Sequence, residues 1–203
     1  MSRSMRRDLR RSIRKSAGRY LAILAIIALG SGFLVGLRST KGDMMATAQT
    51  YIDKQALFDL RVLNTYGYTQ EAVDVLGAQP GIGAAEGAIS IDALLSLPSR
   101  INVPELQAGR MPQRPGECLA DGYYYTQGDI GKTLTLSQAN ESDTLEQFTV
   151  EEFTIVGTAN SPLYLSTDRG TSSLGTGRVN GFVLLPTGAF AMDTYTDAYL
   201  TVS

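Results

Sequence analysis

The chain of 203 residues has no histidine, no tryptophan and a single cysteine, Cys118. Without histidine a Ser-His-Asp triad cannot be built, and one cysteine alone does not supply the ligands of a zinc site. Cys118 also lacks a second cysteine for an internal disulfide and a histidine that could activate it as a nucleophile. We interpret it as a small residue in a strand. No set of residues is a candidate catalytic, cofactor-binding or metal-binding site.

The formal net charge of -2 conceals a strong asymmetry. Up to position 38, Asp8 opposes nine basic residues: Arg3, Arg6, Arg7, Arg10, Arg11, Arg14, Lys15, Arg19 and Arg38. This part carries +8, so the remainder carries -10. An acidic remainder without a basic stripe has no footprint for nucleic acid, whose binding requires clustered Lys and Arg. The basic cluster instead flanks an apolar segment.

The segment 20–37 holds 18 residues without a charge. As a helix it would be roughly 27 Å long, which nearly spans the hydrocarbon core of a bilayer. Arg19 and Arg38 bracket it, and Tyr20 is placed as an interfacial aromatic residue. Since basic residues crowd the N-terminal flank, the positive-inside rule puts residues 1–19 in the cytoplasm and 38–203 outside. The sequence predicts one transmembrane helix over 20–37.

Two other interpretations of this segment are open. A secretory signal peptide has a similar basic front, and Ala46-Thr47-Ala48 resembles its cleavage site. The apolar run is longer than a usual signal core, and Lys41 and Asp43 separate it from that site, so a retained anchor fits better. A buried helix of a soluble protein would need a large surrounding core, because the segment is apolar around its whole circumference.

Both flanks of the apolar segment show helical spacing. In the basic segment 1–19, apolar residues recur every four positions: Met5, Leu9, Ile13 and Ala17. This predicts an amphipathic helix on the inner membrane surface, whose charges serve either topology alone or contact with a cytoplasmic partner. In 38–56 a second stripe predicts a helical stalk that continues the membrane helix: Met44, Ala48, Tyr51 and Gln55.

The remaining chain predicts an α+β domain in which an α/β lobe holds an inserted β-rich lobe. The α/β lobe begins over 57–95, with a strand at 57–63, a turn at 64–67 and a short helix after Thr69, its N-cap. Another strand follows within 82–95. The β-rich lobe covers 96–180, begins irregularly in a Pro- and Gly-rich stretch, and has strand patterns at 131–137 and 148–159. Residues 181–203 are expected to return as strands of the α/β lobe.

Several short motifs suggest chemistry that their context does not support. Gly131-Lys132-Thr133 resembles the end of a phosphate-binding loop, but Thr126 stands where that loop needs glycine, and a strand pattern follows. The acidic pairs Glu151-Glu152 and Asp121/Asp129 could in principle bind a cation or act as acid and base, but no sequence feature places their carboxylates on a common face. We expect them to be solvated strand and turn residues.

Two further motifs have ordinary explanations. Asn140-Glu141-Ser142 fits the glycosylation pattern, which matters only in a eukaryotic secretory route. The run Tyr123-Tyr124-Tyr125 could be a binding patch, but we expect an alternating strand with at least one ring in the core.

Four stretches resemble the FtsX-like or MacB-like permeases of bacterial ABC transporters. They are RRSIRKSAGRYLAILAIIALGSGFLVGLRST, DKQALFDLRVLNTYGYTQEAVDVL, LQAGRMPQRPGECLAD and SPLYLSTDRGTSSLGTGRVNGFVLLP. The first resembles the family's first membrane helix, the second the start of its extracytoplasmic core domain, and the third its recurring turn segment. The likeness runs from about Arg10 to Val202. Family members carry further membrane helices after this domain, and their link around 89–98 is longer, which puts an edge strand there in question.

The resemblance implies a permease subunit in the bacterial plasma membrane that works with a separate cytoplasmic ABC ATPase, as a dimer in the full complex. We expect the chain to be the N-terminal part of such a subunit, without catalysis of its own, coupling the ATPase to the outer domain for export or mechanical transmission. The chief alternative is a single-pass anchored binding or sensor domain without an ATPase. A membrane-tethered hydrolase ranks last, since no nucleophile and base are assembled.

Overall fold

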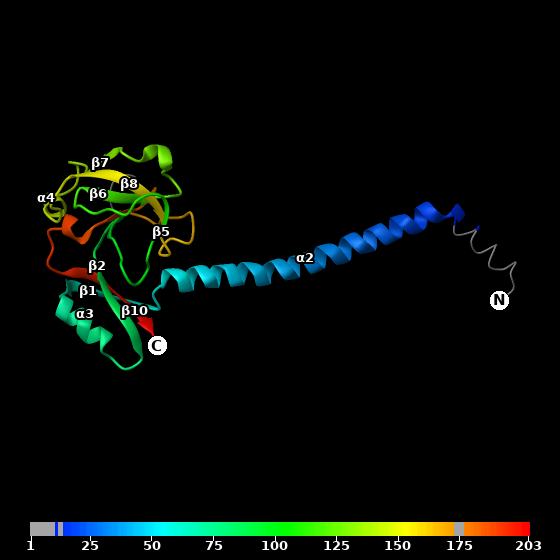
Figure 1. The fold of residues 1–203 in the computed structure, drawn as a ribbon, viewed down its shortest axis with the longest axis horizontal. Helices are drawn as coiled ribbons and strands as arrows, with labels where there is room; N and C mark the ends of the chain where they lie inside the picture. Colours follow the sequence, from blue (N-terminus) through cyan, green and yellow to red (C-terminus); the bar gives the residue numbers. More distant parts are fainter. Residues whose placement is uncertain (1–10, 12–13, 173–176) are drawn as a thin grey trace. The chain divides into compact units, whose positions relative to one another are not determined.

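The structure is a computed structural model that describes residues 11, 14–172 and 177–203. Contacts divide the chain into two compact units, residues 1–51 and 52–203. Met5, Leu9 and Ile13 of the expected amphipathic helix lie outside the described residues. Helices and strands are mixed along the rest of the chain, which confirms an α+β fold at this coarse level (Figure 1).

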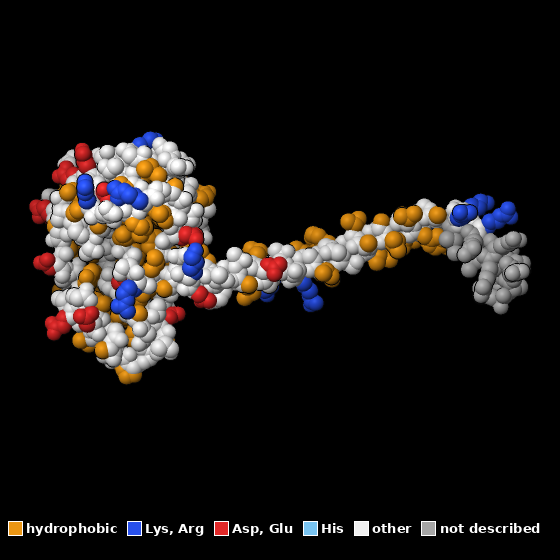
Figure 2. All heavy atoms as spheres, in the orientation of Figure 1, with side chains coloured by type: hydrophobic (Ala, Val, Ile, Leu, Met, Phe, Trp, Pro, Cys, Tyr) orange, Lys and Arg blue, Asp and Glu red, His pale blue; other side chains and the backbone are white. Residues whose placement is uncertain are grey.

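The long helix α2 runs without interruption over Ala17–Gln55. Its 39 residues make it about 58 Å long, so the apolar segment and the expected stalk are one helix. The apolar side chains are exposed along its first half (Figure 2). Within this half the Ser31 hydroxyl donates to the carbonyl of Ile27 at 2.7 Å, which satisfies a polar group locally. Among the described residues, α2 alone is long and apolar enough to cross a membrane, a property that a signal sequence shares.

A three-stranded antiparallel sheet occupies one part of the second unit. Strand β10 (Tyr195–Val202) lies between β1 (Leu60–Tyr68) and β2 (Ile82–Ala88), and α3 (Gln70–Gly77) packs on the sheet. Thr69 caps α3 as predicted, its hydroxyl accepting from the amide of Ala72 at 3.3 Å.

The prediction of a turn at 64–67 is wrong, because β1 continues through these residues to Tyr68. The strand accommodates these residues in a register shift: Leu63 lies opposite Asp197 and Tyr68 opposite Tyr195. Gly67 has φ +78°, where a side chain would be strained, and the Asn64 side-chain amide donates to its carbonyl at 2.9 Å. The turn-forming residues therefore make a bulge inside a strand rather than its end.

A seven-stranded mixed sheet forms the rest of the second unit. Its order is β3-β4-β9-β6-β8-β5, and β7 pairs with the same edge of β8 as β5 does. The strands are β3 (Ser90–Ile91), β4 (Leu94–Ser96), β5 (Glu105–Gly109), β6 (Glu117–Asp121), β7 (Thr133–Thr135), β8 (Glu152–Asn160) and β9 (Val183–Leu185). Short helical segments lie between them: η1 (Gln127–Asp129), α4 (Ser142–Leu145) and η2 (Thr187–Ala189).

The two sheets divide the chain differently from the expected lobes. Strand β3 and the first two residues of β4 fall in 57–95, yet both strands join the larger sheet. Strand β9 falls in 181–203 yet lies between β4 and β6. The irregular stretch at the start of 96–180 contains β5. Both sheets belong to the same compact unit. Short buried strands such as β9 carry too few residues for a period to show which sheet they join.

The core of the larger sheet is centred on β6 and β8. Cys118 in β6 is fully buried, which confirms the expectation of a small strand residue. Burial raises the pKa of its thiol to about 12. Phe153 and Ile155 of β8 are also buried, and the ring of Phe148 packs against Phe153 with centroids 6.3 Å apart.

Candidate functional site

The C-terminal turn of α2 ends in a well-formed cap. The amide of Leu57 donates to the carbonyl of Ile52 at 3.1 Å, and the amide of Ala56 donates to that of Asp53 at 3.3 Å. These two bonds are the Schellman pattern, which places Ala56 in the left-handed region at φ 48°. Alanine stands where glycine is usual, so the conformation is held by neighbouring contacts.

Those contacts come from the segment before β5. The amide of Asn102 donates to the carbonyl of Ala56 at 2.8 Å, and the amide of Val103 donates to that of Gln55 at 2.9 Å. The side-chain oxygen of Asn102 accepts from the amide of Phe58 at 3.0 Å. We call these five residues, Gln55, Ala56, Phe58, Asn102 and Val103, the helix-end cluster. It satisfies the carbonyl of Gln55, the last residue of α2, and that of Ala56, the residue after it.

Asn102 is the central member of the helix-end cluster. It is fully buried and has φ 60°, a conformation that asparagine tolerates better than other residues with a Cβ. Its side-chain oxygen is bonded to Phe58, while its Nδ2 is buried without a hydrogen-bond partner among the described residues. The backbone conformation and the acceptor oxygen are therefore both needed at this position.

Glu86 of β2 holds the loop that carries Asn102. Its carboxylate accepts from the amides of Ser99 at 2.8 Å, Arg100 at 3.0 Å and Ile101 at 2.6 Å, and from the Ser99 hydroxyl at 2.7 Å. Hydrogen bonds to a charged acceptor are stronger than neutral ones. The end of α2 is thus linked through Asn102 and Glu86 to the small sheet.

A buried ion pair fixes a second loop. Arg169 donates to both carboxylate oxygens of Asp121, from Nε at 2.6 Å and from Nη2 at 2.9 Å. Its Nη1 donates to the carbonyls of Tyr164 and Ser166. The guanidinium lies 5.5 Å from the ring centre of Tyr164 and 5.6 Å from that of Phe182, two rings that stack at 4.9 Å. Both side chains are almost completely inaccessible, and the guanidinium donates four hydrogen bonds inside the protein, which is the kind of geometry that such pairs require.

The turn between β5 and β6 is closed by an ion pair. Arg110 donates from both Nη atoms to the carboxylate of Glu117, at 2.9 and 2.7 Å, and the amide of Gln113 donates to the same carboxylate at 2.8 Å. These bonds lower the pKa of Glu117 to about 2, and the bond from Arg110 contributes most. The pair therefore joins the two ends of the turn that connects β5 and β6.

We expect Glu117 to titrate with a pKa of about 2, well below the 4.5 of an ordinary glutamate. Because its folded pKa is depressed, its contribution to stability is present above the unfolded value of 4.5 and is lost as the pH falls toward 2. Carbon-detected NMR of the side-chain carboxyl should show this midpoint in the wild type. In Arg110→Gln the midpoint should rise toward 4.5, while Arg114→Gln, an exposed arginine in the same turn, should leave it unchanged. An ordinary midpoint in the wild type would contradict the ion pair.

The structure confirms some motif interpretations. Gly131-Lys132-Thr133 leads from η1 into strand β7, and Lys132 pairs with Asp129 at 2.6 Å. Glu151 and Glu152 are exposed, as expected. Asn140 lies in the turn before α4.

Two other interpretations are wrong in part, although one ring of the tyrosine run does pack against the core as expected. Asp121 is not a solvated residue, because Arg169 neutralises it in the interior. Tyr123-Tyr124-Tyr125 does not form a strand. Asp121 ends β6 and turns the chain: its carboxylate accepts from the amide of Tyr123 at 3.0 Å, and its carbonyl accepts from those of Tyr124 and Tyr125. Only Tyr125 packs against the core, while the other two rings are exposed.

Sequence reasoning missed Asn102, Glu86 and Arg169. Asn102 stands between apolar residues in a stretch with two prolines, which gave a faint signal of a special backbone position. Arg169 is one of few cations in an acidic domain. The residues around it in the sequence do not indicate that it pairs with Asp121, 48 positions away.

Comparison of the chain with protein-family models, with curated proteins and with solved structures found no match. The likeness to the permease family therefore stands on the sequence stretches alone.

Proposed function

We propose that the chain is the N-terminal part of a permease subunit of a bacterial ABC transporter. Residues 1–19 lie in the cytoplasm beside a separate ATPase, the first half of α2 spans the plasma membrane, and residues 52–203 form an extracytoplasmic domain. The subunit couples ATP-driven events inside the cell to that domain, for export or for transmission of force. The subunit pairs with a second permease subunit in the complex.

The continuity of α2 is the observation that carries this proposal. A bilayer core needs about 20 helical residues, whereas α2 has 39, so helix remains after the span. The helix contains no proline, so no missing N–H interrupts its hydrogen-bond ladder between the apolar segment and its C-terminal end. A separate binding domain on a tether would not require such a continuous helix.

The helix-end cluster supports the same proposal. The carbonyl of Gln55 at the end of α2 accepts from the amide of Val103, and that of Ala56, the next residue, accepts from the amide of Asn102. Lys54 pairs with Glu105 at 3.2 Å. The exposed ion pair adds little, but the backbone bonds and Glu86 join the turn to the small sheet. A displacement of this turn would therefore be passed to the sheet instead of being absorbed by a flexible linker.

The proposed topology is tested by cysteine labelling in intact cells. Cys118 should not react, since it is buried and its pKa is about 12, so the wild type is the unlabelled control. With a membrane-impermeant maleimide, Thr65→Cys should be labelled at once and Ser16→Cys only after the cells are permeabilised. Labelling in the reverse order, or a mature chain that begins near Gln49, would sink the proposal.

The partnership is tested by purification of the full chain from its native membrane in mild detergent. We expect an ABC ATPase to copurify and to be identified by mass spectrometry, and the chain to stimulate or restrain ATP hydrolysis in proteoliposomes. Correct topology without an ATPase in the purified material would instead favour an anchored binding or sensor domain.

A further inference from the structure

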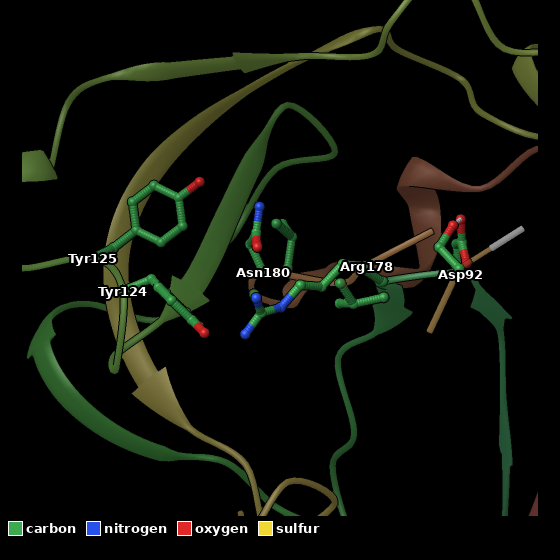
Figure 3. A pocket seen from close by; sticks show the side chains of 10 residues that line it. Asp92, Tyr124, Tyr125, Arg178 and Asn180 are labelled. Atoms are coloured by element: carbon green, nitrogen blue, oxygen red, sulfur yellow. Dashed lines mark hydrogen bonds between the residues drawn. The ribbon is translucent and has the colours of Figure 1, made fainter. Parts of the chain in front are cut away.

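A cavity of about 490 Å³ opens in the second unit beside β9 (Figure 3). Its walls come from the turn between β3 and β4, from the turn after β6, and from the segment that leads into β9. The polar side chains on the walls are Asp92, Tyr124, Tyr125, Ser172, Arg178 and Asn180. This volume lies in the range of small-molecule sites.

Arg178 is the cation of this cavity. None of the five ion pairs recorded among the described residues includes it. The acid on the walls, Asp92, accepts from the Ser172 hydroxyl at 2.6 Å, and Figure 3 shows the Arg178 guanidinium directed toward Tyr124, away from Asp92. In a chain whose residues after position 38 carry -10, a guanidinium without a carboxylate partner is free for an external anion.

The walls around Arg178 are held by backbone contacts. Arg178 forms an antiparallel bridge with Thr171, and the amide of Val179 donates to the carbonyl of Gly170 at 3.4 Å. On the opposite wall the turn after Asp121 places Tyr124, whose ring lies against Gly181. A Cβ added at Gly181 would come within 3.2 Å of that ring. The backbone that carries Arg178 and the ring of Tyr124 are therefore in place before any ligand arrives.

We propose that this cavity binds a small ligand that carries a single carboxylate. The carboxylate pairs with the Arg178 guanidinium, whose planar fork matches two carboxylate oxygens. An apolar group lies on the exposed ring of Tyr124, and an amide or hydroxyl of the ligand bonds to Asn180. One cation in an acidic domain disfavours a polyanion such as a phosphate ester. A free organic acid and a peptide C-terminus share this chemistry, and the site does not depend on an ATPase partner.

The test uses the full chain in nanodiscs and ligand-observed NMR with matched pairs of probes. The first pair is N-acetyl-leucine and its neutral amide, and the second is the tripeptide N-acetyl-Ala-Ala-Leu and its amide. We expect each acid to bind at least tenfold more tightly than its amide. Arg178→Gln should lower the affinity for the acids at least tenfold and Arg178→Lys less. Arg114→Gln removes an exposed arginine outside the cavity and should leave the affinities for the acids and their amides unchanged.

The relative affinities of the two acids identify the source of the carboxylate. Tighter binding of the tripeptide indicates a peptide C-terminus, and tighter binding of N-acetyl-leucine indicates a small organic acid. The proposal is overturned if neither acid binds at millimolar concentration, if acid and amide bind alike, if inorganic phosphate competes as well as the acids, or if Arg178→Gln, folded by circular dichroism, binds like the wild type.

Discussion

Arg169→Ala lowers the free energy of unfolding by about 3–5 kcal/mol, because it leaves the carboxylate of Asp121 buried without its partner. Both side chains are almost completely inaccessible, and the guanidinium makes every one of its recorded bonds inside the protein. The loop that contains Tyr164 and Ser166 also loses its anchor. Since the chain has no tryptophan, urea unfolding of the detergent-solubilised protein is followed by circular dichroism and tyrosine fluorescence.

The double variant Asp121→Leu with Arg169→Met separates the two causes of this loss. An apolar pair of similar size leaves no buried charge, so most of the stability should return. Arg114→Ala, at an exposed position, should change the free energy of unfolding by less than about 0.5 kcal/mol. A loss below 1 kcal/mol in Arg169→Ala, or a double variant as unstable as the single one, would contradict a buried ion pair.

Asn102→Ala destabilises the domain by about 2–4 kcal/mol. The amide of Phe58 loses its acceptor, which costs about 1–3 kcal/mol, and alanine at φ 60° adds about 1 kcal/mol of backbone strain. The measurement is the same urea unfolding. Hydrogen exchange should in addition show faster exchange of the Phe58 amide and of the last turn of α2.

Asn102→Gly is the matched control for the backbone term. Glycine also lacks the acceptor but adopts this conformation freely, so it should be about 1 kcal/mol more stable than alanine here, reversing the usual order of the two residues. Equal losses would mean that φ at this position is ordinary. Asn102→Asp keeps an acceptor for the amide of Phe58 but buries a charge. Its free energy of unfolding should therefore be lower than that of the wild type at neutral pH.

Patterns that repeat along the chain could be predicted from the sequence. The uncharged run at 20–37 and the stripe after it indicate a helix, and Thr69 followed by Glu71 indicates the start of α3. Each depends on neighbours within a few positions. The turn signal at 64–67 is equally local, but pairing with β10 keeps these residues inside β1.

Features that depend on distant partners could not be predicted. Whether Asp121 is solvated depends on Arg169, and what holds the chain just after the cap of α2 depends on Asn102. The sheet to which β9 belongs depends on β4 and β6, which pair with it on either side. In each case the sequence contains the residue but not the contact that defines its role.

The central place of β10 has a consequence for synthesis. Neither β1 nor β2 pairs with any other strand of the small sheet, and the Arg61 to Asp197 ion pair joins residues 136 positions apart. As the polypeptide leaves the ribosome, the backbone N–H and C=O groups of both strands therefore lack their sheet partner until residues 195–202 have emerged. During that interval the nascent domain is most vulnerable to proteases and to pairing with the wrong strand, and a chaperone would protect it most.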